Sequence, residues 1–177
     1  MRSKKKKWRP QEYLFVDGYN IINSWDKLKE LSKIDLDTAR NELIDIMAEY
    51  QSYTETKVII VFDAHLVKKN SGKKDILKGI EVVYTKENET ADHYIEKTLD
   101  EIGRVKKVRV ATSDWMEQQV VLGRGGTRVS ARELEEEILS KKNYMKNKRK
   151  KDNEVNDIFI GKLDEENIEK LKKWLKP

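Results

Sequence analysis

Apolar residues along the chain form two alternating patterns, short continuous runs and helically spaced stripes. Four runs rich in Val, Ile, Phe and Tyr predict β-strands, at residues 13–17 (YLFVD), 57–63 (KVIIVFD), 80–85 (IEVVYT) and 107–112 (KVRVAT). The second run is almost entirely apolar, which is typical of a central strand covered on both faces.

Helical stripes with apolar residues at i, i+3, i+4 and i+7 separate these runs. The stripe before the second run comprises Leu43, Ile46, Met47 and Tyr50, and the stripe after the third comprises Ala91, Ile95, Leu99 and Ile102. Asp37 is the predicted N-cap of the first helix, and Gly103 is the predicted stop of the second.

The last third of the chain reads as further helices. One helix is predicted to follow Asp114 and to end near the sequence GRGG, which is predicted to form a turn. SARE (130–133) is a capping box that opens a basic helix over about residues 130–151. The tail then predicts an extended piece beginning at VNDIFI and a C-terminal helix over about residues 165–175.

Alternating strands and helices favour an α/β domain with a mostly parallel sheet. A chain of 177 residues fits one domain, which we expect over residues 12–177 after a basic, flexible segment at 1–11. There is no cysteine, which excludes disulfides and thiolate chemistry and suits a reducing cytosol. The sequence has no apolar run of membrane-spanning length, and its basic start lacks the apolar region of a secretory signal.

Charged residues make up 39% of the chain, which carries a net charge of +5. The basic excess gathers at Lys4–Arg9 and at 141–151 (KKNYMKNKRKK), where Trp8 and Tyr144 are interleaved with the cations. Such runs attract phosphate backbones, although a solvated helix end and a disordered tail would look similar. The candidate RNA contacts are Lys141, Lys142, Lys146, Lys148, Arg149, Lys150, Lys151, Arg124 and Arg128.

Acidic residues stand where the predicted strands end. Asp17 ends the first strand, Asp63 ends the second and Asp114 follows the fourth, while Glu89 and Asp92 lie in the loop and first helical turn after the third. Because the carboxyl ends of parallel strands share one edge of a sheet, where ligands bind, we expect these acids to converge.

Converging carboxylates repel and raise each other's pKa, a conflict that a hard cation removes. Mg²⁺ or Mn²⁺ takes oxygen ligands from one or two carboxylates together with substrate phosphate, and it lowers the pKa of a bound water. His65 and His93 are the only histidines and have no imidazole or thiolate at metal spacing, so zinc is not expected. The pattern therefore favours a metal–phosphate site.

Each of these residues also has a simpler interpretation. Asp17 and Asp114 could be caps or turn formers, and Glu89 an ordinary first-turn acid. Asn20 could hold a water, a phosphate oxygen or Asp17, or simply form a turn, and Asp63 could only orient Asp17. It is the joint occurrence of the acids that favours catalysis.

Other chemistries lack their signatures. There is no G-x-S-x-G and no serine with a convincing histidine partner, which leaves acyl hydrolysis unsupported, and there is no Walker A lysine motif. A phosphotransfer enzyme on a similar sheet would carry a D-x-D arrangement, whereas Gly-Tyr follows Asp17.

Four stretches in order, FVDGYNII, VIIVFDAH, YTKENETADHYIEK and VATSDWMEQ, closely resemble the YacP group of NYN-domain proteins. These belong to the PIN-like nucleases, and the resemblance covers roughly residues 13–175. It implies a three-layer fold, with a central parallel sheet of order 3-2-1-4-5 flanked by helices, and RNA cleavage by acids around Mg²⁺ or Mn²⁺.

The resemblance also assigns roles. Asp17 matches the first-strand metal ligand, Asn20 its NYN companion, Asp92 the essential acid of the middle helix and Asp114 the acid after the fourth strand. Many relatives carry a further acid at the position of Gln118, and its absence here favours one ion. Candidates for supporting roles around the ligands are Asp63, Ser113 and Glu117, the last being the nearest acid to that position.

The YacP group is similar to bacterial and plastid endoribonucleases that associate with the ribosome and cut mRNA there. The expected protein is a monomeric, metal-dependent endoribonuclease of the cytoplasm or plastid stroma, with RNA and ribosome as partners and no membrane. Asp17, Asp92 and Asp114 would hold the ion, while Asn20 and Glu89 would position water. The alternative is a catalytically inactive ribosome- or RNA-binding module.

Overall fold

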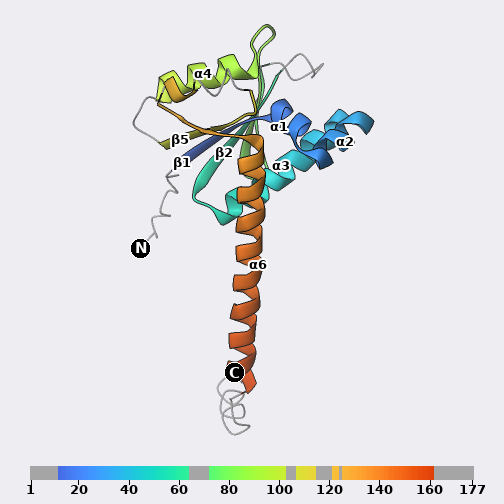
Figure 1. Ribbon diagram of the computed structural model, residues 1–177, viewed down its shortest axis with the longest axis vertical. Helices are drawn as coiled ribbons and strands as arrows, with labels where there is room; N and C mark the ends of the chain where they lie inside the picture. The colour runs from blue at the N-terminus through green and yellow to red at the C-terminus, as the bar shows by residue number, and fades with distance from the viewer. Residues whose placement is uncertain (1–11, 64–71, 103–106, 115–120, 124, 162–177) are drawn as a thin grey trace, which may run out of the picture. The chain divides into compact units, whose positions relative to one another are not determined.

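The computed structural model describes residues 12–63, 72–102, 107–114, 121–123 and 125–161 (Figure 1). The chain divides into two compact units, Met1–Leu139 and Ser140–Pro177, which are described separately below. The single domain expected over residues 12–177 stays a prediction.

A six-stranded sheet of order β3-β4-β2-β1-β5-β6 forms the centre of the first unit. Its strands are β1 (Glu12–Asp17), β2 (Thr56–Phe62), β3 (Lys74–Leu77), β4 (Ile80–Tyr84), β5 (Lys107–Ala111) and β6 (Thr127–Val129). All neighbours are parallel except β3 and β4. This confirms the α/β class with a mostly parallel sheet, and β2 is a central, almost wholly buried strand.

The order differs from the predicted 3-2-1-4-5 because β3 adds an antiparallel edge strand that the sequence reading missed. β3 has only four residues, mostly exposed, so it carries no apolar run. Its pairing depends on the following turn, in which Lys78 and Gly79 both adopt positive φ, 50° and 88°. Two such residues are the backbone requirement of a tight hairpin.

Helices cover both faces of the sheet (Figure 1). On one face α1 (Gly18–Ser24), α2 (Asp26–Ile34), α3 (Leu36–Tyr53) and the start of α6 (Ala131–Gly161) pack against alternate strand residues such as Leu14 and Val16. On the other face α4 (Ala91–Ile102) packs against Phe15 and its neighbours. The period-2 alternation of β1 thus divides its side chains between two separate cores.

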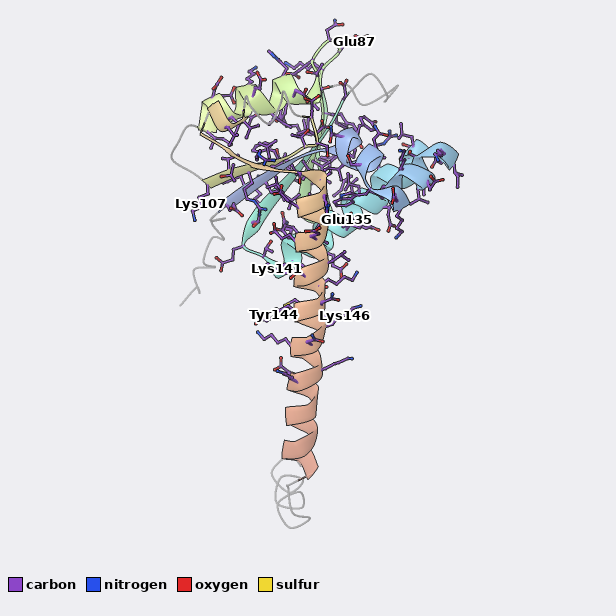
Figure 2. All side chains as sticks on the ribbon, in the orientation of Figure 1. Glu87, Lys107, Glu135, Lys141, Tyr144 and Lys146 are labelled. Carbon is purple, nitrogen blue, oxygen red and sulfur yellow. The ribbon has the colours of Figure 1, made fainter. Side chains whose placement is uncertain are left out.

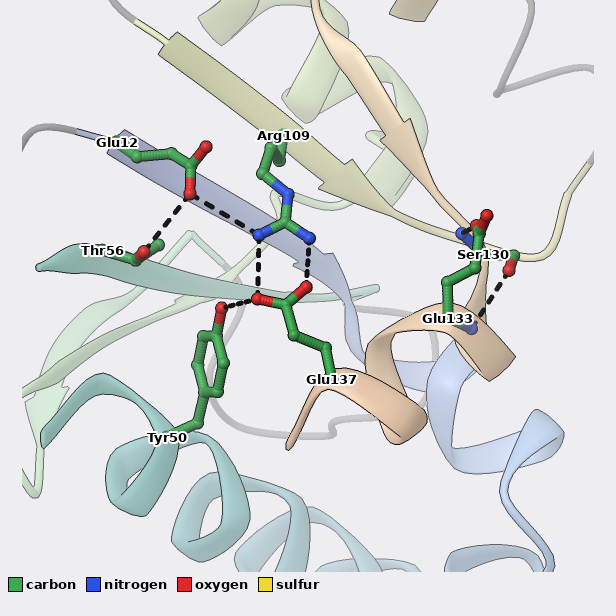
Figure 3. A network of polar contacts seen from close by, with 7 residues as sticks. All are labelled: Glu12, Tyr50, Thr56, Arg109, Ser130, Glu133 and Glu137. Carbon is green, nitrogen blue, oxygen red and sulfur yellow. Dashed lines mark hydrogen bonds and ion pairs between the residues drawn. The ribbon is translucent and has the colours of Figure 1, made fainter. Parts of the chain in front are cut away.

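Helix starts agree with the sequence reading in one case and correct it in another. The capping box is confirmed, because the Glu133 carboxylate accepts the Ser130 N–H at 2.7 Å and the Ser130 hydroxyl accepts the Glu133 N–H at 3.2 Å (Figure 3). The N-cap assigned to Asp37 was wrong. Helix α3 begins at Leu36, and Asp35 caps it by accepting the Thr38 N–H at 2.8 Å.

Helix α6 is longer than predicted. It runs from Ala131 to Gly161, so the extended piece expected at VNDIFI is helical instead. No glycine or proline interrupts residues 131–160, which accounts for one unbroken helix over this stretch. The predicted segment at 1–11, the C-terminal helix at 165–175 and Gly103 lie outside the described residues.

The first turns of α6 are fixed to the sheet by a network of polar contacts (Figure 3). The Arg109 guanidinium on β5 forms a two-pronged ion pair with Glu137, whose carboxylate also accepts the Tyr50 hydroxyl of α3 at 2.6 Å. Glu12 of β1 lies 3.5 Å from the same guanidinium and accepts from Thr56. Burial is the largest cause that raises the pKa of Tyr50 to about 12, and the hydrogen bond to the Glu137 carboxylate is the next. The hydroxyl of Tyr50 therefore stays protonated and remains a hydrogen-bond donor.

No described helix combines the length and the apolar character needed to cross a bilayer.

Candidate active site

Asp17 lies at the carboxyl end of β1 and also caps α1. Its carboxylate accepts the Asn20 N–H at 3.1 Å, which turns the chain from strand into helix. A Cβ on Gly18 would lie 2.3 Å from the ring of Phe62, so only glycine lets α1 begin this close to β2. The simple reading of Asp17 as a cap is therefore correct, and the cap holds the carboxylate at the sheet edge.

The strand register places the other acids at the same edge. Asp17 is level with Val61, two residues before Asp63, and Val16 is level with Ala111, three residues before Asp114. From β1 the chain goes on to β2 on one side of the strand and returns later to β5 on the other. Ligands in open α/β sheets bind at such a switch point.

Electrostatics link three of the predicted acids. Burial raises the pKa of Asp17 from 3.8 to about 6, against the lowering effect of the Asn20 N–H, and the carboxylates of Asp92 and Asp63 raise it further. These groups come from β1, from the first turn of α4 and from the loop after β2. The structure thus brings together Asp17, Asp63 and Asp92, which lie far apart in the sequence.

The loop that carries Asp114 is tied to α1 by Asn20. The Asn20 side-chain oxygen accepts the Ser113 N–H at 2.6 Å, and the hydroxyl groups of Ser113 and Ser24 lie 3.2 Å apart. The Asp114 N–H donates to the Thr112 hydroxyl at 3.0 Å, and the Asp114 side chain is exposed. Asn20 therefore anchors the fourth-strand loop beside Asp17, a role that the sequence reading did not consider.

A cation would need ligands from this group. Among the described residues, no three side chains of His, Cys, Asp or Glu are spaced to hold one metal ion. Mg²⁺ in phosphate-processing sites commonly takes only one or two carboxylates, with water and phosphate completing its shell. The coupled pair Asp17 and Asp92 fits that requirement, since a cation between them would relieve the repulsion that raises the pKa of Asp17.

Glu89 belongs to a local turn before α4. Its carboxylate accepts the Lys86 N–H at 3.2 Å while its own N–H donates to the Lys86 carbonyl, and Asn88 between them has a positive φ of 70°. Its side chain lines a cavity beside α4, together with Lys86 and Tyr94. Glu117 and Arg124 lie outside the described residues, as does the predicted helix after Asp114 apart from residues 121–123.

The sequence reading missed a buried aromatic row beneath the acidic edge. Phe62 packs between Tyr19 and Tyr84, with ring centroids 5.1 and 5.7 Å away. Arg40 of α3 is only 7% exposed and donates to the Tyr19 hydroxyl at 2.7 Å. One signal was available, because Arg40 stands three residues before Leu43 on the apolar stripe of α3, where a cation requires a buried partner.

The predicted basic segment lies in the second unit, on α6. Its side chains are exposed, apart from the half-buried Lys142 and Met145, and Tyr144 is 65% exposed among them. Figure 2 shows Lys141, Tyr144 and Lys146 projecting from the helix. Arg128 in the first unit is also exposed.

Comparison with known proteins gives one consistent result. The family model of the YacP-like NYN domain matches residues 14–176. The chain is 43% identical over 164 residues to the protein YacP of Bacillus subtilis, which covers 92% of this chain and 96% of that protein.

Solved structures agree. The crystal structure of Rae1 (YacP) from Bacillus subtilis matches with a TM-score of 0.69, covering 92% of this chain and 93% of that one. A crystal structure of a mutant of the same protein matches with a TM-score of 0.67, over 78% and 81%. The resemblance found in the four sequence stretches is confirmed, as is the fold class.

Proposed function

This chain belongs to the YacP-like NYN domain family, and we propose that it is a metal-dependent endoribonuclease that cleaves mRNA in association with the ribosome. The observation that carries the proposal is the half-buried Asp17 carboxylate at the switch point of the sheet, whose pKa is raised by desolvation and by the carboxylates of Asp92 and Asp63. A stable binding module gains nothing from this repulsion, whereas a metal-dependent hydrolase uses it to attract a cation.

Asp17 and Asp92 would hold Mg²⁺ or Mn²⁺, and Asp114 would contact the ion through a bound water. When bound, the ion supplies a water of lowered pKa and stabilises charge on the departing oxygen. The residues of the chain provide the positions. The N-cap contact fixes Asp17, and Asn20 holds Ser113, so that Asp114 is kept beside it.

The cations of α6 would hold the RNA backbone. Phosphate contacts of this kind position a nucleic acid without reading its sequence. They would serve equally for mRNA and for ribosomal RNA, and this supports the ribosome as partner. Exposed Tyr144 among the lysines adds a ring on which a base can stack.

The test compares purified wild type, Asp17→Asn and Asp92→Asn on ribosome-bound mRNA, with Mg²⁺ and with EDTA. Cleavage by the wild type alone, abolished by EDTA and restored by Mg²⁺, is the expected result. Asp26→Asn, an exposed acid of α2, is the matched control and should cleave normally. Metal-independent cleavage, or full activity in Asp92→Asn, would refute this mechanism. RNA binding without any cleavage by the wild type would instead favour the inactive binding module.

A further inference from the structure

A cavity of about 360 Å³ lies on the face of the sheet that α4 covers. Tyr13 and Lys57 line it from the strands, and Tyr94, Lys97 and Thr98 line it from α4. Its volume is in the range of sites that hold small organic groups. Nothing in the proposed reaction so far uses it.

The cavity adjoins the acids of the candidate active site along two elements. Phe15 lines its wall, and Asp17 follows two residues later on the same side of β1. Glu89 and Tyr94 also line it, and Asp92 lies between them in the chain. The cavity lining therefore comes within two residues of Asp17 along β1 and within two residues of Asp92 along α4.

The charges of the cavity lining almost balance. Its cations are Lys57, Lys74, Lys86 and Lys97, and its anions are Glu81, Glu89 and Glu101. Lys57 is already paired with Glu81 at 2.7 Å. A bare phosphate favours unbalanced positive charge, so the lining fits a neutral group better.

Aromatic rings complete the lining. Tyr13 and Tyr94 are half-buried, and the Lys74 ammonium lies 5.2 Å from the centroid of the Tyr94 ring and hydrogen-bonds its hydroxyl. Rings offer stacking surfaces to nucleobases, and carboxylates accept hydrogen bonds from amino groups on base edges. The exposed Lys86 and Lys97 can meet the flanking phosphates.

We propose that this cavity holds one base of single-stranded RNA adjacent to the scissile phosphate, with preference for a base that carries an amino group. The inference rests on the proposed nuclease function, which places RNA phosphate at Asp17. It adds the substrate-positioning residues Tyr94 and Thr98 to the site. RNA would be held by base insertion here, in addition to the backbone contacts of the basic helix.

Binding can be read without cleavage. The probe is a short RNA in which one base is replaced by 2-aminopurine, whose fluorescence reports stacking of that base. It is added to the Asp17→Asn protein in EDTA, so that no cleavage occurs. In this background Thr98→Leu fills the cavity and raises helix propensity, and Tyr94→Ala removes a ring. The expected result is a loss of the protein-induced fluorescence change in both. Lys29→Ala, an exposed lysine of α2, should leave it intact.

Steady-state cleavage with an otherwise wild-type protein gives a second readout. Thr98→Leu should raise KM about tenfold, the usual effect of losing one stacked base, with kcat changed much less. Purely structural damage would lower the melting temperature without this split. An unchanged fluorescence response and KM in both variants, with native circular dichroism, would overturn the base site. Failure of the nuclease proposal would appear differently, as absence of cleavage alongside a cavity-dependent fluorescence change.

Discussion

Burial of the Asp17 carboxyl group makes its ionisation costly to the fold. Its pKa rises from 3.8 to about 6, so the folded chain binds this proton more tightly than the unfolded chain does. Stability therefore falls as pH rises from about 4 to about 6 and stays lowered above that range. At about 1.4 kcal/mol per pKa unit, the ionised group costs the metal-free fold up to about 3 kcal/mol.

Asp17→Asn should consequently stabilise the metal-free protein. Asparagine keeps the cap contact with the Asn20 N–H and removes the charge that Asp92 and Asp63 oppose. In EDTA at pH 8 we expect a gain of about 1–3 kcal/mol in the free energy of unfolding by urea. The gain should vanish below about pH 3, where wild-type Asp17 is protonated in both the folded and the unfolded state. A variant less stable than wild type at pH 8 would contradict this account.

The role of Asn20 follows from its hydrogen bond to the Ser113 N–H, which holds the loop that carries Asp114. Asn20→Ala removes the acceptor of the Ser113 N–H and should lower stability by about 1 kcal/mol, the usual net value of one hydrogen bond. Because the Asp114 loop loses its anchor, kcat should fall at least tenfold with a smaller change in KM.

Asn20→Asp tests the same contact, since a carboxylate still accepts the Ser113 N–H. It should recover most of the lost stability at high ionic strength, where salt screens the repulsion from Asp17, but not all of the activity, because it adds a charge near Asp17. Ser32→Ala on α2 is a control that removes an exposed hydroxyl contact elsewhere. An Asn20→Ala protein with normal kcat would show that Asp114 does not depend on this anchor.

Among the elements, the start of α6 depends on one glutamate. The Glu137 carboxylate forms an ion pair with Arg109 and accepts a hydrogen bond from the Tyr50 hydroxyl. The Arg109 and Glu137 side chains are 17% and 28% exposed. Glu137→Ala leaves a largely buried guanidinium without its main partner, so we expect a loss of about 2–4 kcal/mol in urea unfolding. Glu136→Ala, which breaks the exposed pair with Arg132, should cost at most about 1 kcal/mol. Equal losses in the two variants would contradict the anchoring role.

The lysines in the basic part of α6 should act through their charge. Lys148→Ala with Lys150→Ala removes two exposed cations that belong to the second unit. For single-stranded RNA the slope of log affinity against log salt should become shallower by about 1.4, at about 0.7 per lost phosphate contact. Lys29→Ala with Lys107→Ala, two exposed lysines outside the basic segment, is the matched control, and an equal change there would contradict a specific role for the helix.

Considered as a whole, the sheet matches the sequence reading where strands are apolar and departs from it where they are not. Four strands contain runs of buried Val, Ile and Phe, and the sequence predicted all four of them, β1, β2, β4 and β5. β3 and β6 are short and largely exposed, and each is held at a sheet edge by a more buried neighbour, β3 by β4 across a tight turn and β6 by β5. Local pattern carries no information on such edges.

The site divides in the same way. The sequence by itself determined that Asp17 ends a buried strand, that Asp92 opens an amphipathic helix and that a capping box starts α6, because each depends on neighbours within one turn or one strand. Only the tertiary structure decided that Asn20 accepts the Ser113 N–H, that Arg40 donates to the Tyr19 hydroxyl and that a cavity lies beside α4. Those features join residues up to 93 positions apart, and contacts of that kind arise from sheet order and packing, which no local periodicity encodes.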